Sequence, residues 1–428
     1  MKLGILGGGL SGITLQKYVQ CESEILEKEE RPGGLCRSFE KEGFTYDIGG
    51  HILFSKNNQI MITLKGILKE NINCCKRNNK ILFKDRFAKY PFENGLNSLD
   101  KEDIYDCLVG FIKNENPKPK NFLQWIYYNL GNGIADKYLV PYNKKIWKYP
   151  LDKMSMEWVE RVPKPPVEDI IKSAIGLQSE GYVHQLHFLY PLFGGIESLI
   201  KASTKPEGNI TTKFHITKIQ KNRDGWAISD DHMTKYFDNI VITFPVTQAI
   251  KHMENVPREV IKAASGLIHN RIRIILVGIN NTSLMDKSAL YIPQDDVVFH
   301  RLCFMGYFSP NNVPLGCSSL IAEITTNSQN EWHNVSDATL IEKTINDLSV
   351  LKIVDKNDIK VTDIQNIEYG YIVYDSNYKN NISIVRKYFN SIGVKLLGRF
   401  GEFEYINMDE VLMRSKGLAE KMNKKILN

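Results

Sequence analysis

The feature that most constrains this chain is a glycine-rich turn near its N-terminus. Residues 7–12 read Gly-Gly-Gly-Leu-Ser-Gly, directly after the apolar run Leu3–Leu6. A G-x-G-x-x-G sequence in this position is typical of a first buried strand that turns sharply into a helix. The N–H groups and the partial positive charge at the N-terminus of that helix suit a pyrophosphate. The chain is therefore predicted to begin with a Rossmann-like unit that binds a dinucleotide.

Two further motifs follow in the order that such a site needs. The strand-like segment 23–26 ends in Glu27, twenty positions after Gly7, where a carboxylate would accept a hydrogen bond from a ribose hydroxyl. A glycine pair, Gly33-Gly34, and Arg37 come next, and they favour FAD over a plain nicotinamide because they bring backbone to a second phosphate and to the isoalloxazine. The candidate cofactor residues in these motifs are Gly7, Gly9, Leu10, Ser11, Gly12, Glu27, Lys28, Gly34, Leu35 and Arg37.

Composition narrows the class of protein. The 428 residues, 43% hydrophobic and 24% charged, are typical of a globular enzyme with two or three interleaved units. The net charge of +6 is spread over mixed clusters, which favours a small anionic substrate over nucleic acid. Seven cysteines without a C-x-x-C motif argue against a disulfide framework or a zinc site and suit the cytoplasm. No apolar run approaches the ~20 residues of a membrane span, so no membrane partner is expected.

The pattern along the chain predicts an α/β fold with three parts. A discontinuous Rossmann-like FAD-binding domain is expected from residues 1–56, 190–265 and 390–428. Residues 57–189 are predicted to form a mostly helical substrate or lid domain, because apolar residues recur there at helical spacings and prolines separate the segments. Residues 266–389 alternate apolar and polar side chains, which indicates an antiparallel sheet in a substrate domain.

The order of these motifs, with several later segments, resembles the flavoprotein superfamily of amine oxidases, protoporphyrinogen oxidase and UDP-galactopyranose mutase. Within it, the mutases are the most similar group. The segments that carry this resemblance are Gly49–Ser55, Tyr90–Asn94, Pro141–Trp147, Trp158–Pro163, Gly398–Gly401 and Asn407–Asp409.

The resemblance implies a pyranose–furanose mutase that acts on a nucleotide sugar without net oxidation. The substrate would be UDP-galactopyranose or a close analogue, and N5 of reduced FAD would act as the nucleophile at the anomeric carbon while UDP departs. NAD(P)H or another reductant would supply the electrons. No metal is expected, because the histidines other than His51, including the closely spaced His184 and His187, lack an accompanying acidic ligand pattern.

The resemblance assigns roles to single residues. Arg161 and Arg301 match the arginines that grip the diphosphate, since a guanidinium pairs phosphate oxygens bidentately. His51 follows two glycines and is expected beside the flavin, although not as a general base. The candidate substrate-binding residues are Tyr90, Tyr142, Asn143, Trp147, Tyr291, Tyr371 and Tyr405, and the further cofactor-binding residues are Gly50, His51, Ile219, Arg399, Asn407, Met408 and Asp409.

Alternatives remain for several of these residues. Arg161 could pair with Glu157 or Glu160, Arg301 with an acid on a neighbouring strand, and Trp147 could be a core residue. The segment Phe188–Pro191 lacks the arginine of the longer, eukaryote-like mutases, Gln185 stands where asparagine is usual, and Ile372 replaces a proline. These departures leave open which sugar and which nucleotide carrier would bind.

Other functions from different classes also stay open. An oxidase of the same superfamily would act on an amine, a tetrapyrrole or a polyene and would need an apolar cavity without a diphosphate grip. A non-catalytic FAD-dependent protein is the third alternative, which no feature of the sequence favours. A homo-oligomer is compatible with the sequence.

Overall fold

A five-stranded parallel sheet forms around the N-terminal strand. The computed structural model describes residues 1–161, 165–177 and 186–427. Strand β1 (Lys2–Leu6) lies in the centre of the sheet order β19-β13-β1-β2-β9, and its residues 3–6 are fully buried. Helix α1 (Leu10–Tyr18) follows the glycine turn, as predicted. The other strands of this sheet are β2 (Glu22–Leu26), β9 (Asn209–Thr211), β13 (Asn239–Ile242) and β19 (Lys395–Leu396).

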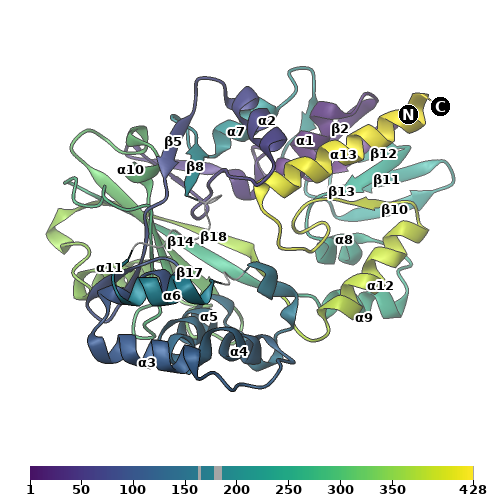
Figure 1. Cartoon of the computed structure of the whole chain (residues 1–428). Helices are drawn as coiled ribbons and strands as arrows, with labels where there is room; N and C mark the ends of the chain where they lie inside the picture. The colour runs from purple at the N-terminus through teal and green to yellow at the C-terminus, as the bar shows by residue number, and fades with distance from the viewer. Residues whose placement is uncertain (162–164, 178–185, 428) are drawn as a thin grey trace.

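Segments from the middle and the end of the chain complete this part of the molecule. The C-terminal helix α13 (Met408–Leu427) crosses α1 (Figure 1). A three-stranded antiparallel sheet carries the order β10-β11-β12. The remaining elements here are β10 (Lys218–Asn222), β11 (Gly225–Ser229), β12 (Thr234–Phe237), α7 (Glu197–Ser203), α8 (Val246–His252), α9 (Arg258–Ser265) and α12 (Tyr378–Ser391).

The second layer is a seven-stranded sheet with the order β18-β14-β17-β16-β15-β6-β7. Its long strands β14 (Ile268–Ile279), β17 (Ser318–Thr326) and β18 (Ile359–Val373) are antiparallel, which confirms the strands expected from the alternation. Strand β17 is buried along its whole length. The remaining elements of this region are β15 (Ala289–Tyr291), β16 (Arg301–Phe304), α10 (Met305–Phe308) and α11 (Asp337–Val350).

The helical character expected for residues 57–189 is found in only part of that range. Helix α2 (Asn58–Leu68) is followed by three strands, and two of them join the seven-stranded sheet through a parallel pairing of β6 with β15. Strand β6 pairs with β15 more than 200 residues further along the chain, β5 pairs with β8 (His187–Tyr190) more than 100 residues further along, and β7 pairs with β6 itself. The strands are β5 (Asn73–Lys76), β6 (Asn79–Phe83) and β7 (Arg86–Lys89).

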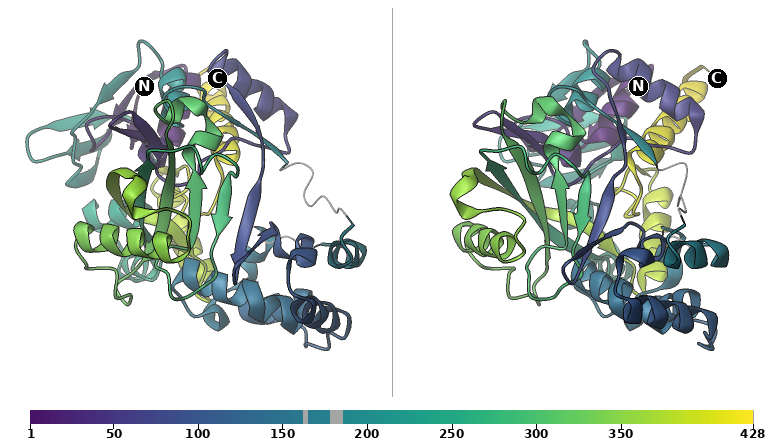
Figure 2. Two further views of the ribbon diagram at one scale, coloured as in Figure 1. Left: turned by 90° about the vertical axis from the view of Figure 1, so that its left-hand side faces the viewer. Right: turned by 60° about the vertical axis from the view of Figure 1, so that its left-hand side comes forward.

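Helices dominate the rest of this range. Asn121 caps helix α4 by accepting a hydrogen bond from the Gln124 amide at 2.9 Å, and the apolar face of α4 is buried. Figures 1 and 2 place this helical part at the opposite end of the molecule from α1 and α13. Its helices are α3 (Lys101–Ile112), α4 (Phe122–Ile134), α5 (Val140–Trp147) and α6 (Val167–Ala174).

A buried carboxyl anchors the loop that leads from the first part into the second. Strands β3 (Ser38–Lys41) and β4 (Phe44–Asp47) pair, and Asp47 is fully buried at the end of β4. Its carboxyl accepts hydrogen bonds from the hydroxyls of Ser38 at 2.6 Å and of Tyr190, in β8 (His187–Tyr190), at 2.7 Å. Burial raises the pKa of Asp47 to about 6. This network fixes the start of the segment Ile48–His51, which reaches the site described below.

In the part of the chain that the structure describes, no helix combines the length and the apolar character needed to cross a bilayer.

Candidate cofactor and substrate site

Glycines form a tight cradle at the carboxyl edge of the parallel sheet. Gly7 has a φ of +113°, a conformation that favours glycine, and a Cβ on Gly12 would lie 2.2 Å from the Gly7 carbonyl oxygen. Gly9 forms a bridge to Gly33, and a Cβ on Gly34 would lie 3.1 Å from the Gly9 Cα. Side chains at these positions would therefore separate the two glycine segments, so both backbones remain open to a ligand at the N-terminus of α1.

The Glu27 carboxylate supports the glycine cradle by accepting a hydrogen bond from its backbone. The Glu27 side chain is 6% exposed, its Oε2 accepts a hydrogen bond from the Gly8 amide at 2.6 Å, and its Oε1 accepts one from the Glu29 amide at 3.0 Å. The carboxylate also lines the cavity, and a carboxylate has room for about four hydrogen bonds in total. Acceptance from a ribose hydroxyl stays a prediction, beside the contact with the glycine turn that the sequence did not indicate.

Replacing Glu27 with alanine should reduce flavin retention. The substitution leaves the Gly8 amide without its acceptor and removes a cavity-lining anion, so binding should weaken by about 1–3 kcal/mol, which is about fivefold to a hundredfold. The ratio of flavin absorbance to protein absorbance after gel filtration measures the effect. Glu30→Ala is the matched control, because Glu30 is exposed and pairs with Lys213. Equal flavin content in the two variants would contradict the assignment.

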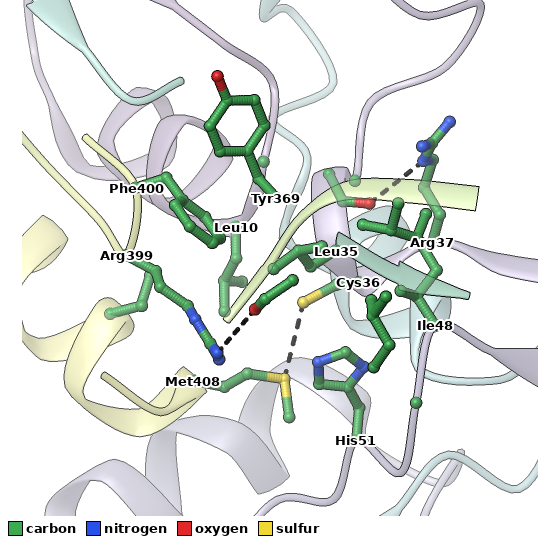
Figure 3. A pocket seen from close by; sticks show the side chains of 18 of the residues that line it. Leu10, Leu35, Cys36, Arg37, Ile48, His51, Tyr369, Arg399, Phe400 and Met408 are labelled. Carbon is green, nitrogen blue, oxygen red and sulfur yellow. Dashed lines mark hydrogen bonds between the residues drawn. The ribbon is translucent and has the colours of Figure 1, made fainter. Parts of the chain in front are cut away.

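The far end of the cavity is shaped by the Ile48–His51 loop and by residues near the C-terminus. Figure 3 shows His51, Cys36 and Met408 around this end of the cavity, and the Cys36 and Met408 sulfurs lie 3.7 Å apart. Arg399 donates from Nη2 to the Gly370 carbonyl at 3.0 Å, and its guanidinium lies 3.9 Å from the centre of the Tyr405 ring. Among the described residues, the buried His51 Nδ1 and Arg399 Nε have no hydrogen-bond partner, so each can serve a ligand.

His51 is neutral over the physiological range. Burial, with a smaller contribution from the positive charge of Arg399, lowers its pKa to about 4. A neutral imidazole against the cavity wall agrees with the expected role beside the flavin. It also agrees with the exclusion of His51 as a general base, since that task needs a pKa near the working pH.

This shift predicts a pH dependence of stability in the cofactor-free protein. Because the unfolded imidazole has its ordinary pKa of 6.5, the stabilisation from neutral His51 is complete above that pH and is lost as the pH falls toward 4. His51→Asn should therefore show a smaller fall in the free energy of unfolding between pH 6.5 and 4.5, measured with urea. His232→Asn, at an exposed position, should keep the wild-type slope. A wild-type slope in His51→Asn would refute the prediction.

The cavity continues to a polar wall on the seven-stranded sheet. Arg301 on β16 lies opposite Glu323 on β17, and their side chains form a bidentate pair with Nε–Oε1 at 2.9 Å and Nη2–Oε2 at 2.7 Å. Glu323 is fully buried. The cross-strand pairing considered for Arg301 is therefore present, and Arg301 still lines the cavity as the predicted diphosphate residue would.

Three tyrosines complete this wall. Tyr291, Tyr371 and Tyr405 all line the cavity. Burial raises the pKa of Tyr291, and burial together with the Glu323 charge raises the pKa of Tyr371 well above its usual value. Both hydroxyls therefore stay protonated. The Tyr371 hydroxyl donates to Glu323 Oε2 at 3.3 Å, and the Tyr291 hydroxyl can donate to an anion.

Other predicted substrate residues lie behind this wall. Tyr90 stacks on Tyr291 with ring centres 4.5 Å apart, and Tyr142 contacts the same ring at 5.5 Å. Trp147 is fully buried and donates from Nε1 to the Asn143 Oδ1 at 3.0 Å, so the core interpretation of Trp147 is the one that the geometry favours. These four residues position the wall, and they do not line the cavity.

The structure corrects the placement of Ile219. Its side chain is 1% exposed on β10, within the core between the three-stranded sheet and α8, away from the cavity. The segment that does line the cavity is Phe214–Ile216, four residues earlier, where the chain leaves β9. Gly12 and Asp409 also do not line the cavity, and Gly12 acts through the close approach described above. The other cofactor candidates line it: Gly7, Gly9, Leu10, Ser11, Glu27, Lys28, Gly34, Leu35, Arg37, Gly50, His51, Arg399, Asn407 and Met408.

Some predicted residues lie outside the described part of the chain, and one important residue was not predicted. Gln185 and His184 lie outside the described residues, and so does the side chain of Arg161, whose backbone belongs to a short 3-10 helix at Met156–Arg161. Glu323 is the principal residue that the sequence analysis missed. A single acid within the apolar run Leu320–Ile324 was the available signal, because a charge in a fully buried strand needs a partner.

The observed cavity suits a flavin dinucleotide. It has a volume of about 750 Å³ and runs from the glycine cradle past His51 to Arg301. The glycines, the N-terminus of α1 and the unpartnered polar atoms of His51 and Arg399 suit a pyrophosphate and a polar ring system. Within residues 1–161, 165–177 and 186–427, no group of three or more His, Cys, Asp or Glu side chains could hold a metal ion.

Fold and site together define a flavin-type dinucleotide-binding protein of the α/β class. Residues 5–65 match the profile of the NAD(P)-binding Rossmann-like domain. A segment of 61 residues, 14% of this chain, is 39% identical to a protein from Methanothermococcus thermolithotrophicus described as an uncharacterized protein in the nifH2 3' region; the match spans 59% of that protein's length.

Solved structures extend the likeness to the whole chain. Reduced UDP-galactopyranose mutase superposes with a TM-score of 0.91 at 25% identity, covering 99% of this chain and 96% of that one. A putative protoporphyrinogen oxidase from Exiguobacterium sp. 255-15 gives 0.79 at 16% identity, over 99% of both chains. Cyclohexylamine oxidase from Brevibacterium oxydans IH-35A gives 0.71 at 13%, over 100% and 99%. Over its whole length the chain therefore resembles UDP-galactopyranose mutase, and its fold fits the amine oxidase-like flavoenzyme superfamily.

Proposed function

We propose that this protein is an FAD-dependent mutase that interconverts the pyranose and furanose forms of a nucleotide sugar. The observation that carries the proposal is the polar wall of Arg301, Tyr291 and Tyr371 in the same cavity as the glycine cradle. An oxidase of amines or polyenes has no use for a guanidinium with neighbouring hydroxyl donors, whereas a departing diphosphate needs them. The likeness to UDP-galactopyranose mutase supports the same choice.

Each part of the cavity has a task in this proposal. The cradle and Glu27 hold the FAD, which in its reduced form supplies a nucleophilic nitrogen to the anomeric carbon. Arg301 binds the diphosphate through the guanidinium edge that Glu323 does not occupy. The hydroxyls of Tyr291 and Tyr405 donate to the diphosphate oxygens, while Tyr371, whose hydroxyl donates to Glu323, lines the same wall. Neutral His51 packs at the flavin side and takes up no proton.

The proposed substrate is UDP-galactopyranose or a close analogue with a different sugar or nucleotide. The segment Phe188–Pro191 contains no arginine. Leu189 of this segment, on β8, is 4% exposed and pairs with Leu53. The diphosphate therefore depends more on Arg301 than it would with a further basic group there. The reductant is proposed to be NAD(P)H or a cellular reductase, in a reducing compartment such as the cytoplasm, where the seven free thiols are stable.

The first test is turnover under anaerobic conditions with the protein in its reduced and oxidised forms. A panel of nucleotide pyranoses and furanoses is incubated with each form, and the products are separated by chromatography. Interconversion by the reduced form alone is expected, and it also identifies the sugar. The absence of any sugar reaction, together with bleaching of the flavin by an amine or an apolar substrate and reoxidation in air, would replace the mutase with an oxidase.

A further inference from the structure

One buried carboxylate joins three walls of the cavity. Glu323 lies in the middle of β17 with no exposed surface. Besides the pair with Arg301, its Oε1 accepts a hydrogen bond from the Gly50 amide at 3.0 Å, and its Oε2 accepts one from the Tyr371 hydroxyl at 3.3 Å. The glycine loop before His51, the proposed diphosphate arginine and the cavity-lining Tyr371 therefore share one partner.

The geometry ties the arginine to the flavin-side loop. The same oxygen, Oε1, receives both the Gly50 amide and Arg301 Nε. A Cβ on Gly50 would lie 2.6 Å from the Cys303 sulfur and 3.8 Å from Glu323 Oε1, so the loop is packed closely against this strand pair. A shift of the Glu323 carboxylate would move the guanidinium relative to the loop. The guanidinium cannot be reoriented while its Nε and Nη2 are both held by that carboxylate.

The charge of Glu323 also acts on any anion at Arg301. Burial opposes the ionised form of Glu323, but the positive charge of Arg301 and the hydrogen bonds outweigh it, so the pKa of Glu323 is lowered. Its negative charge lies directly against the guanidinium that would hold a diphosphate. In a buried site this charge compensates Arg301 and opposes the approach of a second anion.

We propose that Glu323 is a positioning residue that fixes Arg301 against the flavin-side loop and moderates its affinity for the anionic leaving group. The inference rests on the proposed function, since it concerns the diphosphate end of the same site. A leaving group that must depart and return has to be held at a fixed place and released, and the carboxylate serves both needs. Glu323 itself touches neither substrate nor cofactor in this role.

Two substitutions of Glu323 separate the effect of its charge from the effect of its side-chain length. Glu323→Gln keeps the length of the side chain and removes the charge, so UDP should bind at least threefold more tightly, while kcat falls at least tenfold because the amide cannot hold both guanidinium nitrogens. Glu323→Asp keeps the charge and shortens the side chain, so the UDP dissociation constant should stay within twofold and kcat should again fall about tenfold.

The control is Asp337→Asn, which removes a carboxylate from Arg273 on β14; neither Asp337 nor Arg273 lines the cavity. UDP binding is measured by calorimetry, kcat by anaerobic turnover, and flavin content by absorbance. A dissociation constant that is unchanged or weaker in Glu323→Gln, or wild-type kcat in Glu323→Asp, would overturn the inference. If Glu323→Gln does not fold, Glu323→Asp decides alone. If the wild-type protein binds no UDP and converts no sugar, the proposed function fails first, and this inference fails with it.

Discussion

Arg301→Ala should nearly abolish binding of the nucleotide sugar while flavin stays bound. Truncating one partner of a desolvated charge contact typically weakens binding by about 2–5 kcal/mol. The guanidinium lines the substrate end of the cavity, and the glycine cradle lies at the other end. Calorimetry with UDP and with UDP-galactose measures the loss, and the flavin absorbance of the same samples shows that the cofactor site is intact.

The same substitution should also destabilise the protein. Glu323 has no exposed surface, and without Arg301 its charge is left with the Gly50 amide and the Tyr371 hydroxyl. Breaking a buried ion pair from one side costs about 3–5 kcal/mol, so the midpoint of urea unfolding should fall clearly. The carboxyl should then take up a proton more readily, so the loss of stability should be smaller at low pH than at pH 8.

Arg271→Ala is the matched control for Arg301→Ala. Arg271 also makes a two-nitrogen contact with a glutamate on a neighbouring strand, Glu368, at 2.9 and 2.7 Å. That pair is partly exposed, so its loss should cost less than about 1 kcal/mol and leave UDP binding unchanged. An Arg301→Ala protein that loses flavin but keeps its UDP affinity would show that the two ends of the cavity have been assigned the wrong way round.

Gly12→Ala should remove most of the bound flavin and destabilise the N-terminal unit. The added Cβ would lie 2.2 Å from the Gly7 carbonyl oxygen and 3.1 Å from a methyl carbon of Ile5. The neighbour at 2.2 Å is backbone, so relief requires α1 to move away from β1 and the pyrophosphate cradle to open. Overpacking of this kind costs about 1–3 kcal/mol. Urea unfolding and the ratio of flavin to protein absorbance measure the two effects.

Gly66→Ala provides the control for the glycine substitution. Gly66 lies inside helix α2, and a Cβ there meets no atom within 4 Å. Alanine should therefore stabilise the protein by about 0.5–1 kcal/mol, because it restricts the unfolded chain and favours the helix. Gly12→Ala with wild-type stability and full flavin content would mean that α1 does not need its close approach to β1.

Local backbone chemistry explains why the cofactor end could be predicted from the sequence. The glycines at 7, 9 and 12 and the acid at 27 act over short distances along the chain, and the positions that they require follow from one strand, one turn and one helix. Gly12 does not line the cavity, and its contribution is the close packing of α1 against the Gly7 backbone. Ile219 was misplaced because several short strands follow β9, and apolar alternation alone did not decide which residue faces the cavity.

The strands within residues 73–89 are a second case in which local sequence did not predict the structure. This segment contains Asn78-Asn79 and several lysines, which have weak strand propensity, and helices lie on either side of it. Besides the local pairing of β6 with β7, these strands depend on β15 and β8, and such distant partners cannot be read from local preference.

The sequence by itself determined the glycine turn, the acid that supports it, and the order of segments that resembles flavoproteins, because each depends on neighbouring residues or on a motif. The tertiary structure decided the substrate end. Gly50 and Glu323 are 273 positions apart, and only the register of β16 on β17 places Arg301 opposite that glutamate. A one-residue slip would turn either side chain to the other face of the sheet, so no local pattern could have specified the contact.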